Sequence, residues 1–198
     1  MIYLAEKARL EQRALLSQLA LTKVEQVQFD DLITSHHTKL KPISVSAAVD
    51  AKRRFILGAE VSQIPAFGHL AEPSRKKYGP RKSFHKEGLE RLFSNIQHAI
   101  DEKAHFKSDE HTLYPIIVQK YFPNATHERF KGGRGCIAGQ GELKKLNYDP
   151  LFAINHTYAT LRANVNRLFR RTWCTTKDPV MLKNHLDIFI CYFNRQLI

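Results

Sequence analysis

Two aspartates in this chain of 198 residues stand where predicted β-strands could bring carboxylates together. Asp30 lies inside a predicted strand over residues 23–34, where a carboxylate costs free energy unless it is paired, hydrogen-bonded or bound to a metal. Asp109 follows a predicted strand over residues 104–108, at the sheet edge where open α/β proteins bind ligands. If the strands are neighbours, repulsion between the carboxylates favours a divalent cation or a shared proton. Two Mg²⁺ ions held there would support phosphodiester chemistry.

Each aspartate also has a purely structural interpretation. Asp109 precedes a predicted helix over residues 110–122, and aspartate is among the best helix N-caps. Asp30 could be a surface acid at the end of its strand. The residues alone therefore leave two alternatives, a metal-binding pair or two unrelated structural acids.

A predicted helix over residues 149–173 supplies a third polar position. Asp149 is a suitable N-cap, and Pro150 fits the first helical position. Apolar residues recur at steps of three and four and predict one buried stripe, formed by Leu151, Ile154, Tyr158, Leu161, Val165 and Leu168. Asn155 and Arg162 lie two turns apart on the flank of this stripe. The far end of the helix carries Arg167, Arg170 and Arg171. Such a helix is suited to lie beside a polyanion.

The composition describes a globular protein with an excess of positive charge. Hydrophobic residues make up 43% and charged residues 25%, and the formal net charge is +12. This excess favours a nucleic acid partner, although ribosomal and membrane-surface proteins share it. No membrane span or signal peptide is predicted. The three cysteines, Cys136, Cys174 and Cys191, form no CxxC pair, which argues against a disulfide framework or structural zinc site and fits a reducing cytoplasm.

The order of predicted elements indicates an α/β domain. After an N-terminal helix over residues 3–21, which we expect to cover a sheet edge, come three strands over residues 23–34, 42–49 and 53–61. A basic, irregular segment follows at 64–83, then a helix at 84–103, the strand at 104–108, the helix at 110–122, a strand at 125–130, a glycine-rich stretch at 131–148, and two helices. This order predicts a mixed sheet of three antiparallel and two parallel strands with helices on both faces. The glycine-rich stretch lacks the GxxxxGK[ST] pattern of a P-loop and is interpreted as a mobile loop or insertion.

Several segments together resemble a known family. They are QFDDL, then FKSDEHTLYPIIVQKYFP followed by ATHERF, then NHTYATLRANVNRLFRRTWCTTKD and a final HL…YFN. From about Val24 to Asn194 the chain resembles the catalytic domain of bacterial insertion-sequence transposases of the DDE class, which has an RNase H-like fold. The resemblance implies that Asp30 and Asp109 are the first two acids of the triad. Family members carry an acid followed seven residues later by Lys or Arg, positions held here by Asn155 and Arg162.

Asn155 departs from the glutamate that is usual in the family, although some groups carry Asn there. A neutral amide oxygen would hold a second metal ion more weakly than a carboxylate. Glu142 or Asp149 are the alternative third ligands. The resemblance implies Mg²⁺ or Mn²⁺, two ions in all, as the cofactor. It also implies DNA contacts at Arg162, with Arg167, Arg170 and Arg171 along the backbone; His127 resembles a family histidine but is also explained as a structural residue.

The resemblance implies a bacterial, cytoplasmic transposase that cleaves and joins DNA at transposon ends and targets, possibly as a homo-oligomer. Residues 1–22 would be a remnant of the family's N-terminal DNA-recognition region, and residues 23–198 the catalytic domain with its insertion at 131–148. Two alternatives remain open, a catalytically inactive DNA-binding remnant and a nuclease of the same fold.

Overall fold

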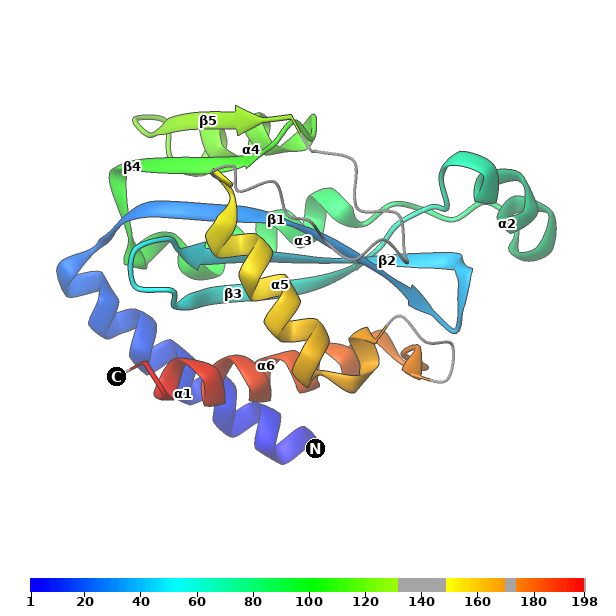
Figure 1. The fold of residues 1–198 in the computed structure, drawn as a ribbon, viewed down its shortest axis with the longest axis horizontal. Helices are drawn as coiled ribbons and strands as arrows, with labels where there is room; N and C mark the ends of the chain where they lie inside the picture. Colours follow the sequence, from blue (N-terminus) through cyan, green and yellow to red (C-terminus); the bar gives the residue numbers. More distant parts are fainter. Residues whose placement is uncertain (132–148, 170–173, 198) are drawn as a thin grey trace.

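A computed structural model describes residues 1–131, 149–169 and 174–197. Its centre is a five-stranded sheet in the order β3-β2-β1-β4-β5 (Figure 1). The strands are β1 (Val24–His36), β2 (Thr38–Asp50), β3 (Ile56–Gln63), β4 (Ile100–Asp109) and β5 (Thr126–Phe130). β1 pairs with β2, and β2 with β3, in antiparallel fashion, whereas β1 with β4 and β4 with β5 are parallel. The prediction of a mixed sheet is confirmed.

Helices cover both faces of this sheet. The α-helices are α1 (Ile2–Thr22), α2 (Ala71–Tyr78), α3 (His85–Ile96), α4 (Leu113–Tyr121), α5 (Phe152–Asn164) and α6 (Pro179–Arg195). Short 3₁₀ turns form η1 (Gly68–Leu70), η2 (Gln97–Ala99) and η3 (Asn166–Leu168). In Figure 1, α5 crosses the front of the sheet, while α3 and α4 lie behind it. In the described parts, no helix is both long and apolar enough to cross a membrane.

Two hydrophobic cores lie on opposite faces of β1. Phe29 packs on one face against Phe93 of α3 and Tyr114 of α4, with ring centroids 5.1 and 4.8 Å away. Leu32 belongs to the other core, which is filled by residues of α5 and α6. Because successive side chains of a strand point to opposite faces, β1 contributes to both cores.

The third helix of the chain approaches the edge strand unusually closely. A Cβ built on Gly88 of α3 would lie 1.8 Å from the hydroxyl and 3.1 Å from the Cβ of Ser62 in β3. Glycine at position 88 thus lets α3 pack directly on the strand, and even a methyl group there would require the Ser62 hydroxyl to rotate away and the helix or strand to shift slightly.

The predicted buried stripe of α5 is confirmed, but the predicted length of the helix is wrong. All six apolar residues of the stripe are buried. The helix begins at Phe152, and Asp149 precedes it, accepting the Leu151 N–H at 2.9 Å. It ends at Asn164, because Val165 is extended, with φ −99° and ψ 98°. The 3₁₀ turn that follows keeps Leu168 in the core; the predicted continuation over 170–173 lies outside the described residues.

Two other predictions about local structure are wrong. Residues 100–103, predicted as helix, belong to β4, because Ile100 is buried and pairs with Val24 of β1. The segment predicted to be irregular contains α2, which is docked by a hydrogen bond from Ser74 Oγ to the Leu40 carbonyl at 2.6 Å. In both cases a tertiary contact decides the local structure, which sequence periodicity does not report.

The terminal helices close the edge strand β3, as expected for α1. Gln12 of α1 donates to the carbonyl oxygens of Ile56 and Leu57 at 3.0 and 3.2 Å. Asn194 of α6 accepts the Ile56 N–H and donates to the Ile56 carbonyl, both at 2.9 Å. These amides satisfy backbone groups that an edge strand would otherwise expose.

The Asn194 contacts generate a prediction about stability. We expect Asn194→Ala to lower the free energy of unfolding by about 1–3 kcal/mol, because it leaves the buried Ile56 N–H without a partner, while the Ile56 carbonyl keeps its bond from Gln12. Denaturant titration measures the change. Asn95→Ala, at an exposed position of α3, is the matched control and should shift stability little. Equal effects of the two substitutions would contradict the role of Asn194.

Candidate active site

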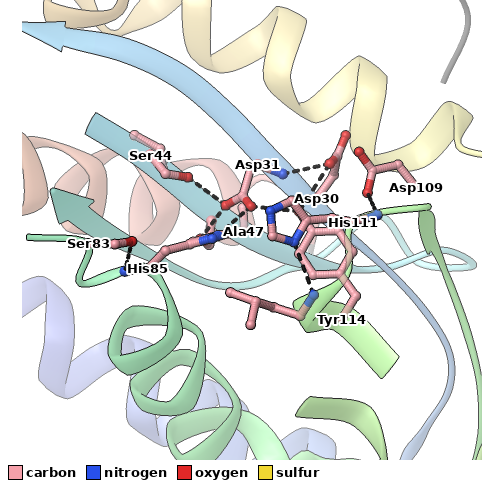
Figure 2. A network of polar contacts seen from close by, with 12 residues as sticks. Asp30, Asp31, Ser44, Ala47, Ser83, His85, Asp109, His111 and Tyr114 are labelled. Carbon is pink, nitrogen blue, oxygen red and sulfur yellow. Dashed lines mark hydrogen bonds and ion pairs between the residues drawn. The ribbon is translucent and has the colours of Figure 1, made fainter. Parts of the chain in front are cut away.

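Asp30 and Asp109 lie side by side at the junction of β1 and β4. The parallel register pairs Gln28 with Lys107, and two further residues along each strand bring Asp30 opposite Asp109. Both carboxylates line one cavity of about 440 Å³, and Figure 2 shows them next to each other. The expectation that their strands are neighbours is therefore confirmed.

The environment of Asp30 disfavours its charge. The pKa of Asp30 is raised from its ordinary value of 3.8 to about 7, chiefly by burial and in smaller part by the charges of Asp109 and Asp31. The Asp31 N–H at 2.7 Å and the Tyr114 hydroxyl at 3.3 Å lower it in part. Among the described residues, no Lys, Arg or His forms an ion pair with Asp30 or Asp109. The pair is a concentration of negative charge without a counter-charge from the described chain.

Asp31, the next residue, is fully compensated. Its carboxylate lies 2.5 Å from His85 Nε2 and accepts hydrogen bonds from Tyr114 at 2.7 Å, Ser44 at 2.6 Å and Ser46. Burial alone would raise the pKa of Asp31, but the hydrogen bond and charge of His85 and the two serines lower it overall. Figure 2 shows this network on the side of β1 that faces α3 and α4. Asp31 is thus a structural anion held by its neighbours.

No sequence motif pointed to His85, which begins α3 far from Asp31 in the chain. Its ring meets that of His111 edge to face, with centroids 4.9 Å apart. The backbone N–H of His111 donates to Asp109 Oδ1 at 2.8 Å. This bond orients Asp109 in the turn before α4, although the N-cap of that helix is Thr112. Asp109 is therefore not the N-cap of α4, although its carboxylate does accept a hydrogen bond in the turn before that helix. The same carboxylate also lines the cavity.

The first two turns of α5 are fixed on β1 around Asp30. Gln28 donates to the Pro150 carbonyl at 3.0 Å and accepts the Ile154 N–H at 3.1 Å. The Tyr158 hydroxyl donates to the Asp30 carbonyl oxygen. Ile154 and Tyr158 bracket Asn155 in sequence, so the helix turn that carries Asn155 lies beside Asp30.

Asn155 itself does not line the cavity of the two aspartates. Its side chain is exposed, and Nδ2 donates to Asp149 Oδ2 at 3.0 Å. The structure therefore brings together two of the three predicted ligands, while Asn155 and its alternative Asp149 contact each other at the start of α5. Glu142, the remaining alternative, lies outside the described residues.

Of the four predicted DNA contacts, the structure describes Arg162 and Arg167. Arg162 lines a groove of about 650 Å³ together with Lys39 and other residues of the β1–β2 hairpin and with Phe67, which follows β3. Arg167 lies 3.5 Å from the Thr176 hydroxyl, next to the hairpin strand β1, to which Thr176 is bridged. Arg170 and Arg171 lie outside the described residues.

His127 is explained by its structural role. Its Nε2 lies 2.8 Å from Ser108 Oγ, and its ring packs 5.6 Å from that of Phe29. Burial lowers the pKa of His127 to about 4, so the imidazole is neutral at physiological pH. Of the cysteines, Cys174 and Cys191 are free thiols, and Cys136 lies outside the described residues.

Within 1–131, 149–169 and 174–197, no cluster of three or more His, Cys, Asp or Glu side chains has the arrangement of a metal site. The described chain thus supplies a carboxylate pair but not a complete metal-ligand set. A scan against protein-family models and a search of curated proteins found no match to this chain.

The raised pKa of Asp30 generates a prediction for the metal-free protein. Asp30 binds a proton more readily in the folded state, with a pKa of about 7, than in the unfolded chain, at 3.8. Its stabilising contribution is therefore complete below the lower pKa and is lost as the pH rises through the higher one. In EDTA, we expect the unfolding free energy relative to Asp30→Asn to fall by roughly 3 kcal/mol between these limits. Denaturant titrations across this pH range measure the difference. Glu110→Gln, at an exposed position, should follow the wild-type profile; identical profiles for all three proteins would refute the uncompensated burial of Asp30.

Proposed function

We propose that this chain is an RNase H-like enzyme of the insertion-sequence transposase class, which cleaves and transfers DNA strands. The observation that carries the proposal is the convergence of Asp30 and Asp109 at neighbouring parallel strands, with α5 fixed across Asp30. The strand order β3-β2-β1-β4-β5, with three antiparallel strands and two parallel pairs, is compatible with that fold. The net charge of +12 is consistent with a DNA substrate.

The carboxylate pair has the properties of a divalent cation site. Asp30 is buried with a raised pKa, and no cationic side chain of the described residues pairs with it or with Asp109. Asp30 and Asp109 would hold Mg²⁺ or Mn²⁺, and Asn155 would complete the set from the adjacent turn of α5. When bound, the metal supplies Lewis-acid stabilisation to the attacking and leaving oxygens of a phosphodiester.

The chain itself fixes these carboxylates in place. The His111 N–H orients Asp109, and the Asp31 N–H and Tyr114 hydroxyl orient Asp30. The compensated Asp31 stiffens the middle of β1 without adding an unpaired charge to the cavity. Arg162, on the flank of α5, would contact a DNA phosphate, and Arg167, Arg170 and Arg171 would contact the backbone further along. The protein would work in the bacterial cytoplasm, with transposon ends and target DNA as partners.

Asp109→Asn tests this proposal. With Mg²⁺ or Mn²⁺, we expect the wild type to nick a labelled duplex that carries the DNA flanking its coding sequence, and to join it to a plasmid. Asp109→Asn should abolish both reactions, while duplex binding stays unchanged or becomes tighter because a negative charge is lost. Gel separation of nicked and joined products measures the outcome. Wild-type cleavage that is unaffected by the substitution would refute the assignment, and cleavage without joining would identify a nuclease.

The exposure of Asn155 favours a second candidate function, a DNA-binding remnant without catalytic activity. The amide is hydrogen-bonded to Asp149, outside the cavity of the two aspartates. A protein of this kind would bind the duplex but would not cleave it in the presence of either Mg²⁺ or Mn²⁺.

Asn155→Glu distinguishes a ligand from a bystander at this position. If Asn155 completes the site, a carboxylate there should tighten Mn²⁺ binding by roughly tenfold, since it adds a charged ligand. Calorimetric titration measures the affinity. Asn164→Glu, at an exposed position of the same helix, adds the same charge away from the site and serves as the control. An affinity gain that is absent, or equal in the control, would show that position 155 does not contact the metal.

A further inference from the structure

Residues 65–83 form an arm that begins and ends at the rim of the candidate active site. Pro65 and Phe67 at its start, and Ser83 at its end, line the cavity that contains Asp30 and Asp109. Between them the chain forms η1 and α2, and Figure 1 shows α2 projecting beyond the body of the sheet near the β1–β2 hairpin. The arm is thus attached directly to the place where a phosphodiester would react.

The arm is anchored at its base by β2. Ser74 donates to the Leu40 carbonyl at 2.6 Å, and the ammonium group of Lys41 lies 4.7 Å from the centre of the Tyr78 ring. Gly79 ends α2 with a φ of 74°, a conformation that favours glycine. These contacts make the arm an ordered structure and fix the direction in which its side chains project.

The arm carries cations without acidic partners. It has five basic residues, Arg75, Lys76, Lys77, Arg81 and Lys82, and a single acid, Glu72, which gives a net charge of +4. Within the described parts of the chain, none of the five forms an ion pair. Elsewhere several basic residues do form ion pairs, such as Arg9 with Asp187. The arm therefore concentrates uncompensated positive charge at the rim of the site.

The side chain of Arg81 is an independent indication of an anion-binding site. Its Nε and Nη2 atoms are closed off from solvent and have no hydrogen-bond partner among the described residues. Burial accordingly lowers the pKa of Arg81 below its ordinary value. Arg75 and Arg81 line one cavity of about 120 Å³ at the base of α2. An oxyanion bound in this cavity would lie between two guanidinium groups, which recognise phosphate through paired donors.

We infer that the arm binds the phosphate backbone of duplex DNA beside the reacting strand, with one phosphate held between Arg75 and Arg81. The inference rests on the proposed function for its choice of polyanion. The groove that Arg162 lines also contains Ala66, Phe67 and Leu70 of the arm, so it joins α5 to the arm along one surface. The arm reads no base sequence, because phosphate contacts position a duplex without identifying it.

An anionic membrane is the competing polyanion, and the arm is poorly suited to it. Interfacial helices insert a broad apolar face into the lipid. The sequence of α2, AEPSRKKY, offers only Ala71 and Tyr78 as hydrophobic residues, and Tyr78 is already in contact with Lys41. DNA phosphates require charge alone and therefore match the arm better.

The test is the salt dependence of binding to a fluorescent duplex of arbitrary sequence, measured by anisotropy in EDTA so that no cleavage occurs. Replacing both arginines, Arg75→Gln with Arg81→Gln, should reduce the slope of log K against log salt by about 0.9, as expected for the loss of the one phosphate that they hold together. A second variant, Lys76→Gln with Lys77→Gln, changes only exposed positions of the arm and should also reduce the slope. It keeps the inference testable if the first variant fails to fold. Lys7→Gln with Arg13→Gln removes two exposed charges from α1 and should leave the slope unchanged.

Three results would overturn the inference. They are unchanged slopes in both arm variants, an equal loss in the α1 control, and tighter binding of the wild type to phosphatidylserine vesicles than to the duplex. Failure here is separable from failure of the proposed function. If the wild type cleaves DNA but the arm variants have the same salt slope as the wild type, only the inference about the arm is contradicted. If the arm variants have altered slopes but the wild type never cleaves DNA, only the catalytic proposal is contradicted.

Discussion

Two aspartates occupy consecutive positions of β1, and the alternation of a strand sends them to opposite faces of the sheet. Asp31 lies on the face of α3 and α4, where His85 forms an ion pair with it and three hydroxyl groups donate hydrogen bonds to it. Asp30 lies on the side of α5, next to Asp109, and receives no cationic side chain from the described residues. The difference separates a carboxylate that its neighbours compensate from one that lines the cavity beside Asp109 without a cationic partner among the described residues.

The position of α5 follows from the same strand. Gln28 binds the backbone of its first turn through both a carbonyl and an N–H, and Tyr158 binds the carbonyl of Asp30. A helix attached at three polar points, with its apolar stripe in the core, has little freedom to rotate. The flank that carries Asn155 and Arg162 is therefore fixed relative to the two aspartates.

The sequence predicted features that depend on local pattern and failed where distant contacts decide. Strand alternation and helical periodicity located the five strands and the stripe of α5, because burial imposes those periods. Neighbouring strands then placed Asp30 beside Asp109. The helix α2 was missed because it is held by Ser74 and Tyr78 against β2, and His85 because nothing in its local sequence marks a partner for Asp31. The orientation of Asn155 depends on Asp149, a contact that helical periodicity does not specify.

The close approach at Gly88 links the sheet edge to the chemistry of the cavity. His85 lies one turn earlier in the same helix, so a bulky residue at 88 would push α3 off Ser62 and carry the imidazole away from Asp31. The strand would then hold two adjacent uncompensated acids. A substitution at a glycine that lines no part of the cavity would thus disturb the charges inside it, and a smaller residue at position 62 of β3 would be expected to relieve the effect.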